Sequence, residues 1–413
     1  MFPGWKSTLA FSLAVLLLAG AGIGFNLSGR ANLRLEQFLC DHLLLCWDEA
    51  VREEAFRRLW GAEEPDLRRA VAGFEELVRR NPANPFRWCD LAEALMQAGM
   101  LERARASMLR AVQLGPNLAA VLVRAGNLCY RTEEVPQALV YHARVLQITD
   151  EYDGLVFSTY SRMGVPIQEV LARGIPASTR QAHAYLLYLI GETNLAEAEQ
   201  TWSWIKARGL ADTALAAEYV EFLLDQEKYE AGAAVWAESA GRADPSFYRN
   251  DNLVFNGDFE LDPAGPLDWR VTAMKGVEVV RDSKVAFSGT WSLRIRFDGT
   301  DNVGFAHVSH AVVVPPGTYS FEAAVRTEGI TTDEGLSFRI IDGDWYASTQ
   351  PLTGTTTWTK VRQVVHMPRG RMVQIRLVRR RSQKFDNKIQ GTAWVDAVTL
   401  RPIQTGAAIE PPE

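Results

Sequence analysis

The hydrophobic positions of this chain follow two different periods, and the first period is helical. Between Pro85 and Leu118, apolar residues recur three and four positions apart in two runs separated by Gly99. This spacing predicts two helices packed as a hairpin, with Gly99 in the turn and Pro116 beyond the second helix. The residues expected to pack between the two helices are Trp88, Leu91, Ala92, Leu95, Ala104, Met108 and Ala111.

Counted from Pro85, these residues occupy the positions that define a tetratricopeptide repeat, and the stretch resembles that family. The resemblance implies a stack of helical hairpins, because one hairpin cannot bury its own apolar face. It also implies a concave groove, lined by the first helix of each repeat, that binds a protein partner. The expected groove residues are Phe86, Met96, Asn127 and Arg131. Ordinary exposed side chains at these positions are the alternative.

The helical pattern extends on both sides of this hairpin. Arg69–Pro82 fits the second helix of a repeat, and Ala119–Tyr152 continues in register. The pattern then breaks, and the glycines and prolines of the following stretch predict a single short helix, Ile167–Arg173. The repeat pattern resumes more loosely over Thr179–Ser246, where Trp236 predicts a tight contact with the domain that follows.

After Asp251 the hydrophobic period changes to two, which predicts β-strands. Short stretches of alternating apolar and polar residues, such as Tyr319–Val325, follow one another between Gly- and Pro-containing turns. A series of this kind predicts an all-β sandwich. The expected organisation is a multidomain chain with a transmembrane or signal helix over residues 1–29, an all-α repeat solenoid over 30–248, an all-β jelly-roll sandwich over 249–403 and a disordered tail over 404–413.

Five segments of the predicted sandwich carry a second resemblance. They are, in chain order, NLVFNGDFE, SGTWSLRI, VVVPPGTYSFEAAVRT, TTTWTKV and GTAWVDAVTL. Together they resemble the carbohydrate-binding jelly rolls that accompany xylanases and laminarinases, which implies that the sandwich binds a polysaccharide. The resemblance also implies a structural calcium ion, with Glu260 and Asp396 at the matching positions. Satisfaction of these two carboxylates by backbone amides is the alternative.

Arginines alternate with apolar residues along several predicted strands, so they are expected to share sheet faces. Guanidinium groups match carboxylate and sulfate groups, and such a face is expected to bind an acidic polysaccharide. A solvated, charged sheet face is the alternative. The arginine candidates are Arg339, Arg362, Arg376 and Arg380. The aromatic candidates for stacking against sugar rings are Trp345, Tyr346, Phe305 and Trp358.

The amino-terminal stretch Thr8–Phe25 contains no charged residue, with Lys6 before it and Arg30 after it. Its length is close to the roughly 20 apolar residues that cross a bilayer. An uncleaved membrane anchor is expected, and a secretory signal cleaved near Ala21 is the alternative. Both send the remaining chain across the membrane. The expected location is therefore the cell membrane, as a single-pass protein with its bulk in the periplasm or outside the cell.

The net charge and the absence of common catalytic motifs exclude several classes of protein. The net charge is −6 over 413 residues, which argues against nucleic-acid binding. Residues 252–402 carry 19 Lys and Arg against 16 Asp and Glu, so the remaining chain is the acidic part. The four cysteines have no metal-binding spacing, and no phosphate-loop, GxSxG or HExxH motif occurs. We therefore expect no enzymatic activity and no cofactor other than the calcium ion.

These patterns together predict a membrane-anchored, non-catalytic adaptor of the cell envelope. The repeat region is expected to bind protein partners, and the jelly roll to bind a polysaccharide. The architecture resembles accessory proteins of exopolysaccharide assembly or export. A protein-interaction scaffold whose sandwich binds no sugar is the alternative.

Overall fold

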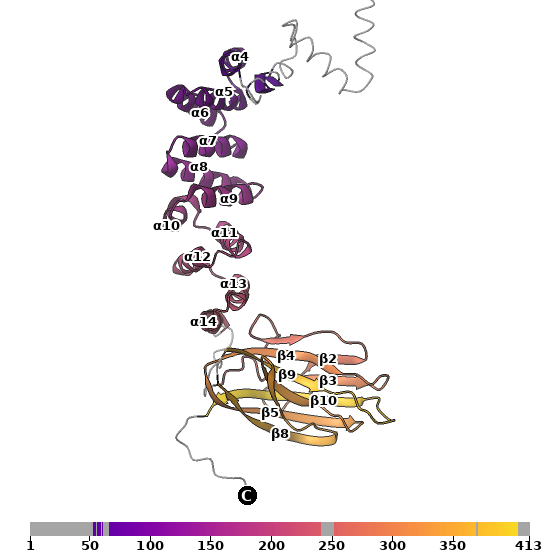
Figure 1. Cartoon of the computed structure of the whole chain (residues 1–413). Helices are drawn as coiled ribbons and strands as arrows, with labels where there is room; N and C mark the ends of the chain where they lie inside the picture. Colours follow the sequence, from indigo (N-terminus) through magenta and orange to yellow (C-terminus); the bar gives the residue numbers. More distant parts are fainter. Residues whose placement is uncertain are drawn as a thin grey trace, which may run out of the picture. The chain divides into compact units, whose positions relative to one another are not determined.

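The computed structural model describes residues 53, 54, 56–58, 60, 66–240, 252–368 and 371–403. The chain divides into two compact units, Met1–Leu210 and Ala211–Glu413. The described part of the first unit is helical, and the second unit contains two helices followed by β-strands (Figure 1). The prediction of a helical region followed by an antiparallel two-sheet sandwich is therefore confirmed.

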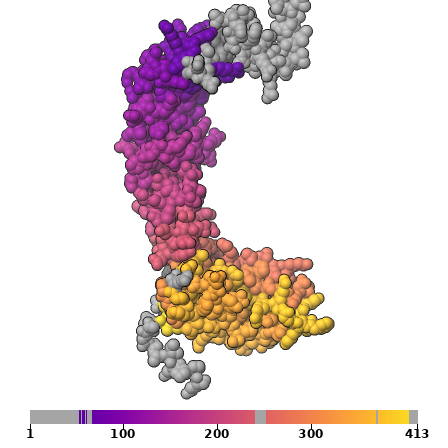
Figure 2. Space-filling view, in the orientation of Figure 1, coloured from indigo at the N-terminus to yellow at the C-terminus, as the bar shows by residue number. Residues whose placement is uncertain are grey.

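The described helices of the first unit pack against their neighbours in the chain, several of them as hairpins, and the space-filling view shows their atoms as one continuous body (Figure 2). Hairpin partners include α5 with α6, α7 with α8, and α11 with α12. The elements are α4 (Leu67–Arg80), α5 (Pro85–Gln97), α6 (Leu101–Leu114), α7 (Ala119–Arg131), α8 (Val135–Ile148), α9 (Asp153–Met163), α10 (Ile167–Glu169), the π-helical turn η1 (Val170–Gly174), α11 (Thr179–Gly191) and α12 (Leu195–Ala207).

The α5–α6 hairpin packs as its sequence predicts. Leu91 and Leu95 of α5 are 4% and 1% exposed, and Ala104 of α6 is completely buried. A larger side chain at Ala104 would overpack the contact between the two helices. Gly99 lies in the turn with a φ of 76°, a left-handed conformation that glycine adopts without strain.

Between α8 and α11 the structure differs from the sequence prediction. A single short helix was expected, but α9 occupies Asp153–Met163, and the expected helix is divided into α10 and η1. Val156, Phe157 and Tyr160 of α9 are buried at helical spacing. The Tyr160 hydroxyl donates a hydrogen bond to the Gly174 carbonyl at 2.9 Å. The apolar residues of α9 thus have helical spacing in the sequence. The glycines and prolines that follow them lie beyond the end of this helix and do not interrupt it.

The second unit begins with α13 (Thr213–Asp225) and α14 (Tyr229–Ala240), and ten described strands follow in two antiparallel sheets. Sheet A has the strand order β1-β4-β9-β6-β7, and sheet B has the order β2-β3-β10-β5-β8. The strands are β1 (Trp269–Val271), β2 (Val277–Asp282), β3 (Ser292–Asp298), β4 (Phe305–Val314), β5 (Gly317–Ile330), β6 (Ser337–Asp342), β7 (Trp345–Ser348), β8 (Gly354–Met367), β9 (Arg371–Arg379) and β10 (Gln390–Pro402).

One hydrophobic core lies between the two sheets. On β6, Phe338 and Ile340 are 1% and 0% exposed, whereas the intervening Arg339 is half-buried. Because successive side chains of a strand point to opposite faces, Arg339 lies on the outer face of sheet A. Phe321 from sheet B meets Phe338 across the core, with ring centroids 5.0 Å apart.

The two helices of the second unit pack against its sandwich. Trp236 of α14 is 3% exposed and meets Phe255 edge-on, with ring centroids 5.4 Å apart. Val313 of β4 and Met372 of β9 pack against the same apolar cluster. These two residues are register partners on the outer face of sheet A. One end of that face is therefore covered by apolar side chains. The predicted contact between Trp236 and the residues that follow the helices is present.

Two sequence predictions concern residues that lie outside the described part of the chain, namely the apolar segment Thr8–Phe25 and the tail 404–413. Within the described ranges, no helix has both the length and the apolar character needed to cross a membrane. The membrane anchor therefore stays a prediction.

Replacement of Leu91 by alanine is expected to lower the free energy of unfolding by about 2–5 kcal/mol, because it removes buried methyl groups and leaves a cavity. Urea unfolding of the full chain, followed by far-ultraviolet circular dichroism, measures the change. Leu109→Ala is the matched control, since Leu109 lies on the same hairpin and is 53% exposed. We expect that control to change stability by less than about 0.5 kcal/mol. Equal losses in both variants would contradict the observed packing.

His310 makes the stability of the sandwich depend on pH. Its side chain is 1% exposed and packs edge-on against Trp269, and its Nε2 donates a hydrogen bond to the Phe255 carbonyl at 3.0 Å. Burial lowers the pKa of His310 from 6.5 to about 4. His310 therefore becomes protonated near pH 6.5 in the unfolded chain, but only near pH 4 in the folded chain.

We expect the free energy of unfolding to be constant above pH 7 with respect to this residue and to fall between pH 6.5 and pH 4. The slope is about 1.4 kcal/mol per pH unit for one histidine. Thermal unfolding followed by tryptophan fluorescence across this pH range measures it. His310→Gln removes one titrating group and should make the profile less steep, while His142, whose pKa burial also lowers to about 4, still contributes. An unchanged slope in that variant would assign the effect to other groups.

Candidate binding sites

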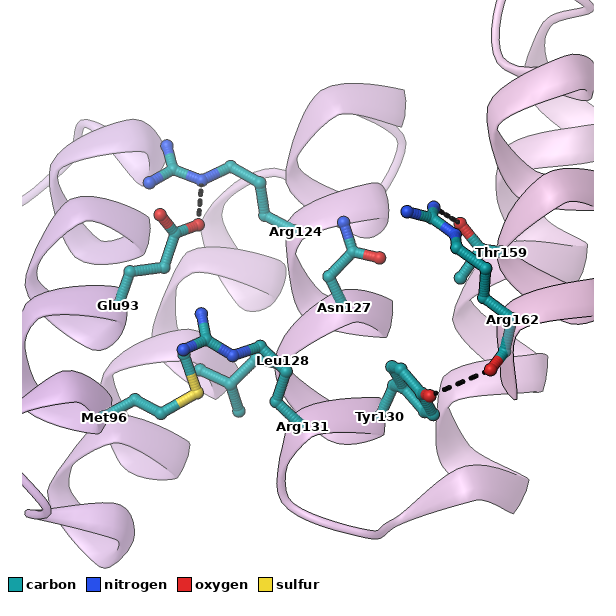
Figure 3. Close-up of a pocket in the computed structure, with 9 residues that line it drawn as sticks. All are labelled: Glu93, Met96, Arg124, Asn127, Leu128, Tyr130, Arg131, Thr159 and Arg162. Carbon is teal, nitrogen blue, oxygen red and sulfur yellow. Dashed lines mark hydrogen bonds and ion pairs between the residues drawn. The ribbon is translucent and has the colours of Figure 1, made fainter. Parts of the chain in front are cut away.

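The first unit contains a pocket of about 470 Å³ between α5, α7 and α9 (Figure 3). It contains Met96, Asn127 and Arg131, which are three of the four groove residues predicted from the sequence. The fourth, Phe86, is 39% exposed in the first turn of α5 and is not part of the pocket lining. The other lining residues are Glu93, Arg124, Leu128, Tyr130, Thr159 and Arg162.

The polar side chains of the pocket fall into two groups. Arg124 and Arg162 are held by the protein itself: Arg124 Nε donates to Glu93 Oε1 at 2.6 Å, and Arg162 Nη2 donates to Thr159 Oγ1 at 3.0 Å. Asn127 and Arg131 make no side-chain hydrogen bond or ion pair to any part of the chain that the structure describes. They lie four positions apart on α7 and therefore on one helix face. Their donors are thus available to a partner in the pocket.

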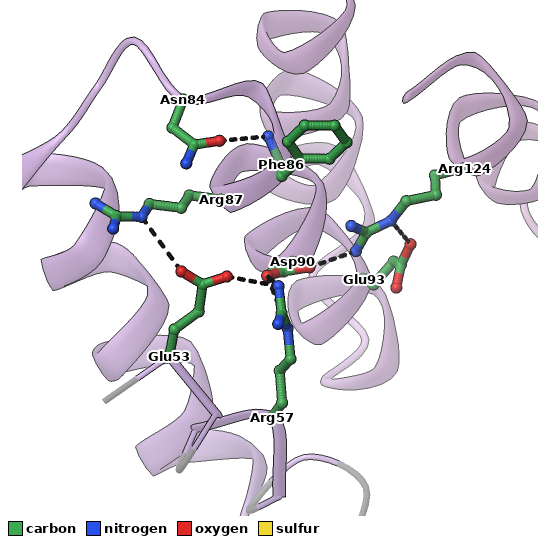
Figure 4. Close-up of polar contacts among 8 residues, drawn as sticks. All are labelled: Glu53, Arg57, Asn84, Phe86, Arg87, Asp90, Glu93 and Arg124. Carbon is green, nitrogen blue, oxygen red and sulfur yellow. Dashed lines mark hydrogen bonds and ion pairs between the residues drawn. The ribbon is translucent and has the colours of Figure 1, made fainter. Parts of the chain in front are cut away.

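A buried carboxylate fixes the edge of this pocket (Figure 4). The side chain of Asp90 is 3% exposed and lies between two arginines. Arg57 Nη2 is 2.9 Å from Asp90 Oδ2, and Arg124 Nη2 is 2.6 Å from Asp90 Oδ1. Since Arg124 also holds Glu93, one network sets the orientation of both side chains that line the pocket on this side.

The second candidate site is the outer face of sheet A. One row of outward residues crosses all five of its strands, and each residue is the register partner of the next. We call it the arginine row; its residues are Arg270, Ser309, Arg376, Arg339 and Ser348. With strands about 4.8 Å apart, the row is about 19 Å long.

The neighbouring outward row brings an aromatic ring to the arginine row. It contains Ala311, Gln374, Ile341 and Tyr346, again as successive register partners. Tyr346 is 54% exposed, and the guanidinium carbon of Arg339 lies 4.3 Å from the centroid of its ring. The two rows thus place charged, amide, hydroxyl and aromatic groups on one surface.

The four predicted arginines occupy two kinds of environment. Arg362 lies on sheet B, where its Nε is 2.6 Å from Glu322, and Arg380 Nε is 3.3 Å from Glu334. Arg339 and Arg376 have no acidic partner among the described residues. The Nε atoms of both are buried without a hydrogen-bond partner. Of the four, only Arg339 and Arg376 therefore have no acidic partner within the described part of the chain.

The four predicted aromatic residues do not form one surface. Trp345 is 46% exposed, but it precedes Tyr346 on β7 and so points to the opposite side of that strand. Trp358 lies on β8 of sheet B, where it meets Phe287 with ring centroids 5.6 Å apart. Phe305 is 2% exposed and belongs to the core. Tyr346 alone among them lies beside the arginine row.

Sequence reasoning missed four residues of this face, namely Arg270, Ser309, Ser348 and Gln374. The Gln374 amide is already oriented, because its Oε1 accepts a hydrogen bond from Arg376 Nη2 at 2.5 Å. The alternation along each strand was a readable signal for their outward direction. The alignment of the strands was not, since β1, β4, β6, β7 and β9 are far apart in the sequence.

The predicted calcium ligands Glu260 and Asp396 hold a single loop. Glu260 Oε1 accepts hydrogen bonds from the backbone N–H of Thr290 and Trp291, at 2.6 and 2.9 Å. Asp396 Oδ2 accepts from the N–H of Phe287 and Ser288, at 2.7 and 3.0 Å. Within the described ranges, no group of three acidic, His or Cys side chains could hold a metal ion. Calcium takes six to eight oxygen ligands, so these two carboxylates fall short of a site by themselves, and calcium stays a prediction.

No family model matches the chain, and no curated protein matches it. Solved carbohydrate-binding modules are similar to its sandwich. The module TmCBM61 in complex with β-1,4-galactotriose is 19% identical, with 37% of this chain and 99% of that chain covered and a TM-score of 0.28.

Two xylan-binding domains are similar to the same degree. The CBM22-1 domain of Paenibacillus barcinonensis Xyn10C is 19% identical over 36% of this chain and 92% of that chain, with a TM-score of 0.26. A second xylan-binding domain, from CBM 22, is 16% identical over 38% of this chain and 100% of that chain, with a TM-score of 0.27. These TM-scores are below 0.5. The sandwich is therefore described from its own strand order and not from its similarity to these structures.

Replacement of Arg124 by alanine is expected to lower the free energy of unfolding by about 2–3 kcal/mol, because buried Asp90 loses one of its two arginine partners. Arg131→Ala is the matched control, since Arg131 lines the same pocket and has no partner in the described chain. We expect a change below about 0.5 kcal/mol for the control. Chemical unfolding of both variants measures the difference, and equal stability of the two would contradict a structural role of Arg124.

Proposed function

We propose that this chain is a non-catalytic binding protein that uses its sandwich to hold a polysaccharide and its helical unit to hold a protein partner. The observation that carries the first part is the exposed ring of Tyr346 beside Arg339 on the outer face of sheet A. Neither side chain is needed for the core, which lies on the opposite face of the sheet. An exposed aromatic ring with polar groups around it suits the apolar face and the hydroxyl groups of a sugar.

The covered end of sheet A gives this face a boundary. Val313 and Met372 lie under the apolar cluster that includes Trp236, whereas Gln374 and Arg376, further along β9, continue onto the open part of the face. A polysaccharide lying on the open part would meet hydroxyl, amide and guanidinium groups along the arginine row. Five segments of the sandwich sequence resemble carbohydrate-binding jelly rolls, and this resemblance also supports polysaccharide binding.

The helical unit is proposed to be a tetratricopeptide-type arm. Of the seven residues expected to pack in the α5–α6 hairpin, six are buried and Trp88 is half-buried. The pocket between α5, α7 and α9 offers Asn127 and Arg131 as free donors above the apolar side chains of Met96 and Leu128. A groove of mixed polar and apolar character suits an extended protein segment, whose backbone needs hydrogen-bond partners.

The cellular role is proposed from the sequence. The uncharged run Thr8–Phe25 would anchor the chain in the cell membrane, and the remaining chain would lie outside the cytoplasm. There the chain would contribute to exopolysaccharide assembly or export by linking a polysaccharide to a protein of the machinery. The alternative function is a protein scaffold whose sandwich binds no sugar, and the free donors of the helical pocket are the feature that favours it.

Replacement of Tyr346 by alanine tests polysaccharide binding by the sandwich. We expect the full chain to be retarded in affinity gels that contain galactan, xylan or polygalacturonate, and Tyr346→Ala to weaken binding to the retained polymer about tenfold, or about 1.4 kcal/mol. Tyr346→Phe should bind normally, because it keeps the ring. Trp345→Ala is the matched control, since Trp345 is comparably exposed on the other side of the strand.

Two outcomes of these assays would overturn parts of the proposal. Normal migration of the wild-type chain in every gel would favour the scaffold over the polysaccharide-binding protein. Release of reducing sugar from any of the three polymers by the purified chain would contradict its non-catalytic nature.

A further inference from the structure

We infer that the polysaccharide held by sheet A is acidic, and that Arg339 and Arg376 together bind a carboxylate or sulfate group on its sugars. This inference rests on the polysaccharide binding proposed above. It specifies the chemical class of the ligand and the two side chains that select it.

The two arginines lie directly opposite each other in the sheet. Arg339 and Arg376 are direct register partners on β6 and β9, so their Cβ atoms are about 5 Å apart on the same face. Like charges directly opposite each other destabilise a sheet. Within the part of the chain that the structure describes, no carboxylate offsets the repulsion between them. An anion placed between the two guanidinium groups would remove it.

The hydrogen-bond donors of both guanidinium groups are only partly used within the described part of the chain. Arg339 Nε and Arg376 Nε are both buried from solvent and have no hydrogen-bond partner. These Nε atoms are buried, so a ligand would meet the Nη donors: those of Arg339 make no hydrogen bond to the described residues, and Arg376 uses only Nη2, for Gln374. A carboxylate or a sulfate has several oxygens and accepts from two guanidinium groups at once. A neutral sugar hydroxyl offers a weaker acceptor to the same donors.

Sheet B differs from sheet A in the partners of its basic side chains. On sheet B, Glu322 binds both Lys360 and Arg362, and Arg294 binds Glu278, all on the outer face. On the outer face of sheet A, the register partners of Arg376 and Arg339 on the flanking strands are Ser309 and Ser348. Acidic side chains therefore offset part of the positive charge on sheet B, whereas Arg339 and Arg376 have no acidic partner among the described residues.

The arginine row also gives this face an extended positive character. Arg270 begins the row on β1, two strands away from Arg376, and it too has no acidic partner among the described residues. Two positive positions separated by about 10 Å match a polymer that carries repeated negative groups better than a single small anion. The ligand class is therefore an acidic polysaccharide, with uronate and sulfate groups as the two sources of charge.

The test compares polymers that differ only in charge. Affinity gel electrophoresis of the full chain is run with polygalacturonate and its methyl ester, and with dextran sulfate and dextran. We expect at least tenfold tighter binding to the charged member of one pair, and the pair that shows it identifies the group as carboxylate or sulfate. Because exposed charges are screened by salt, the preference should shrink as the ionic strength rises.

Three variants then assign the preference to the two arginines. Arg339→Gln and Arg376→Gln should each weaken binding to the charged polymer at least tenfold and leave binding to its neutral counterpart unchanged. Arg362→Gln is the matched control, because it removes an equal charge from the ion-paired face of sheet B, and it should bind like the wild type. Each variant is checked by thermal unfolding without ligand. Removal of one of two opposed like charges should leave the unfolding temperature unchanged or raised.

The outcomes separate this inference from the proposed function. Equal binding to both members of each pair, with loss of binding in Tyr346→Ala only, would overturn the acidic ligand and keep polysaccharide binding. Equal weakening by Arg362→Gln would overturn the assignment to sheet A, since net charge alone would then explain the preference. Absence of binding to all four polymers would overturn both.

Discussion

The strand register of sheet A is the constraint on which the proposed binding face depends. Phe338 and Ile340 on β6 and Ile375 on β9 are at most 1% exposed and face the core. Because side chains alternate along a strand, Arg339 and Arg376 then have to face outward. A slip of one residue in either strand would bury a guanidinium group and expose the apolar set. Hydrophobic burial on one face of the sheet therefore positions the polar groups on the other face.

Arginine has two different roles in this chain, and the presence of a nearby carboxylate separates them. Arg124 in the helical unit is bound to buried Asp90 and helps to hold the α5 and α7 helices together. Arg362 on sheet B is bound to Glu322 and belongs to a neutralised surface. Arg376 has an amide, Gln374, and no acidic group as its neighbour. The first two arginines are ion-paired within the protein, whereas the third has no acidic partner in the described part of the chain.

Hydrophobic periodicity was enough to predict the helices and strands of the fold, but not the arrangement of residues at the site. The helical hairpins and the sandwich follow from apolar spacing, because burial of those side chains determines both. The site depends on which strands become neighbours, and spacing within one strand does not contain that information. Arg339 and Arg376 could be predicted to point outward, but not to lie opposite each other. Phe305 was predicted to stack against sugar rings, which requires an exposed ring. It instead packs in the core against Phe297.

The central claim is that an acidic sugar binds across Arg339 and Arg376 on the outer face of sheet A. The most direct measurement is a crystal structure of the full chain with a galacturonate trisaccharide. The account predicts one sugar carboxylate within about 2.7–2.9 Å of both guanidinium groups, with a sugar ring against Tyr346. A trisaccharide bound on sheet B or on the loops, with Arg339 and Arg376 left without a ligand, would contradict it.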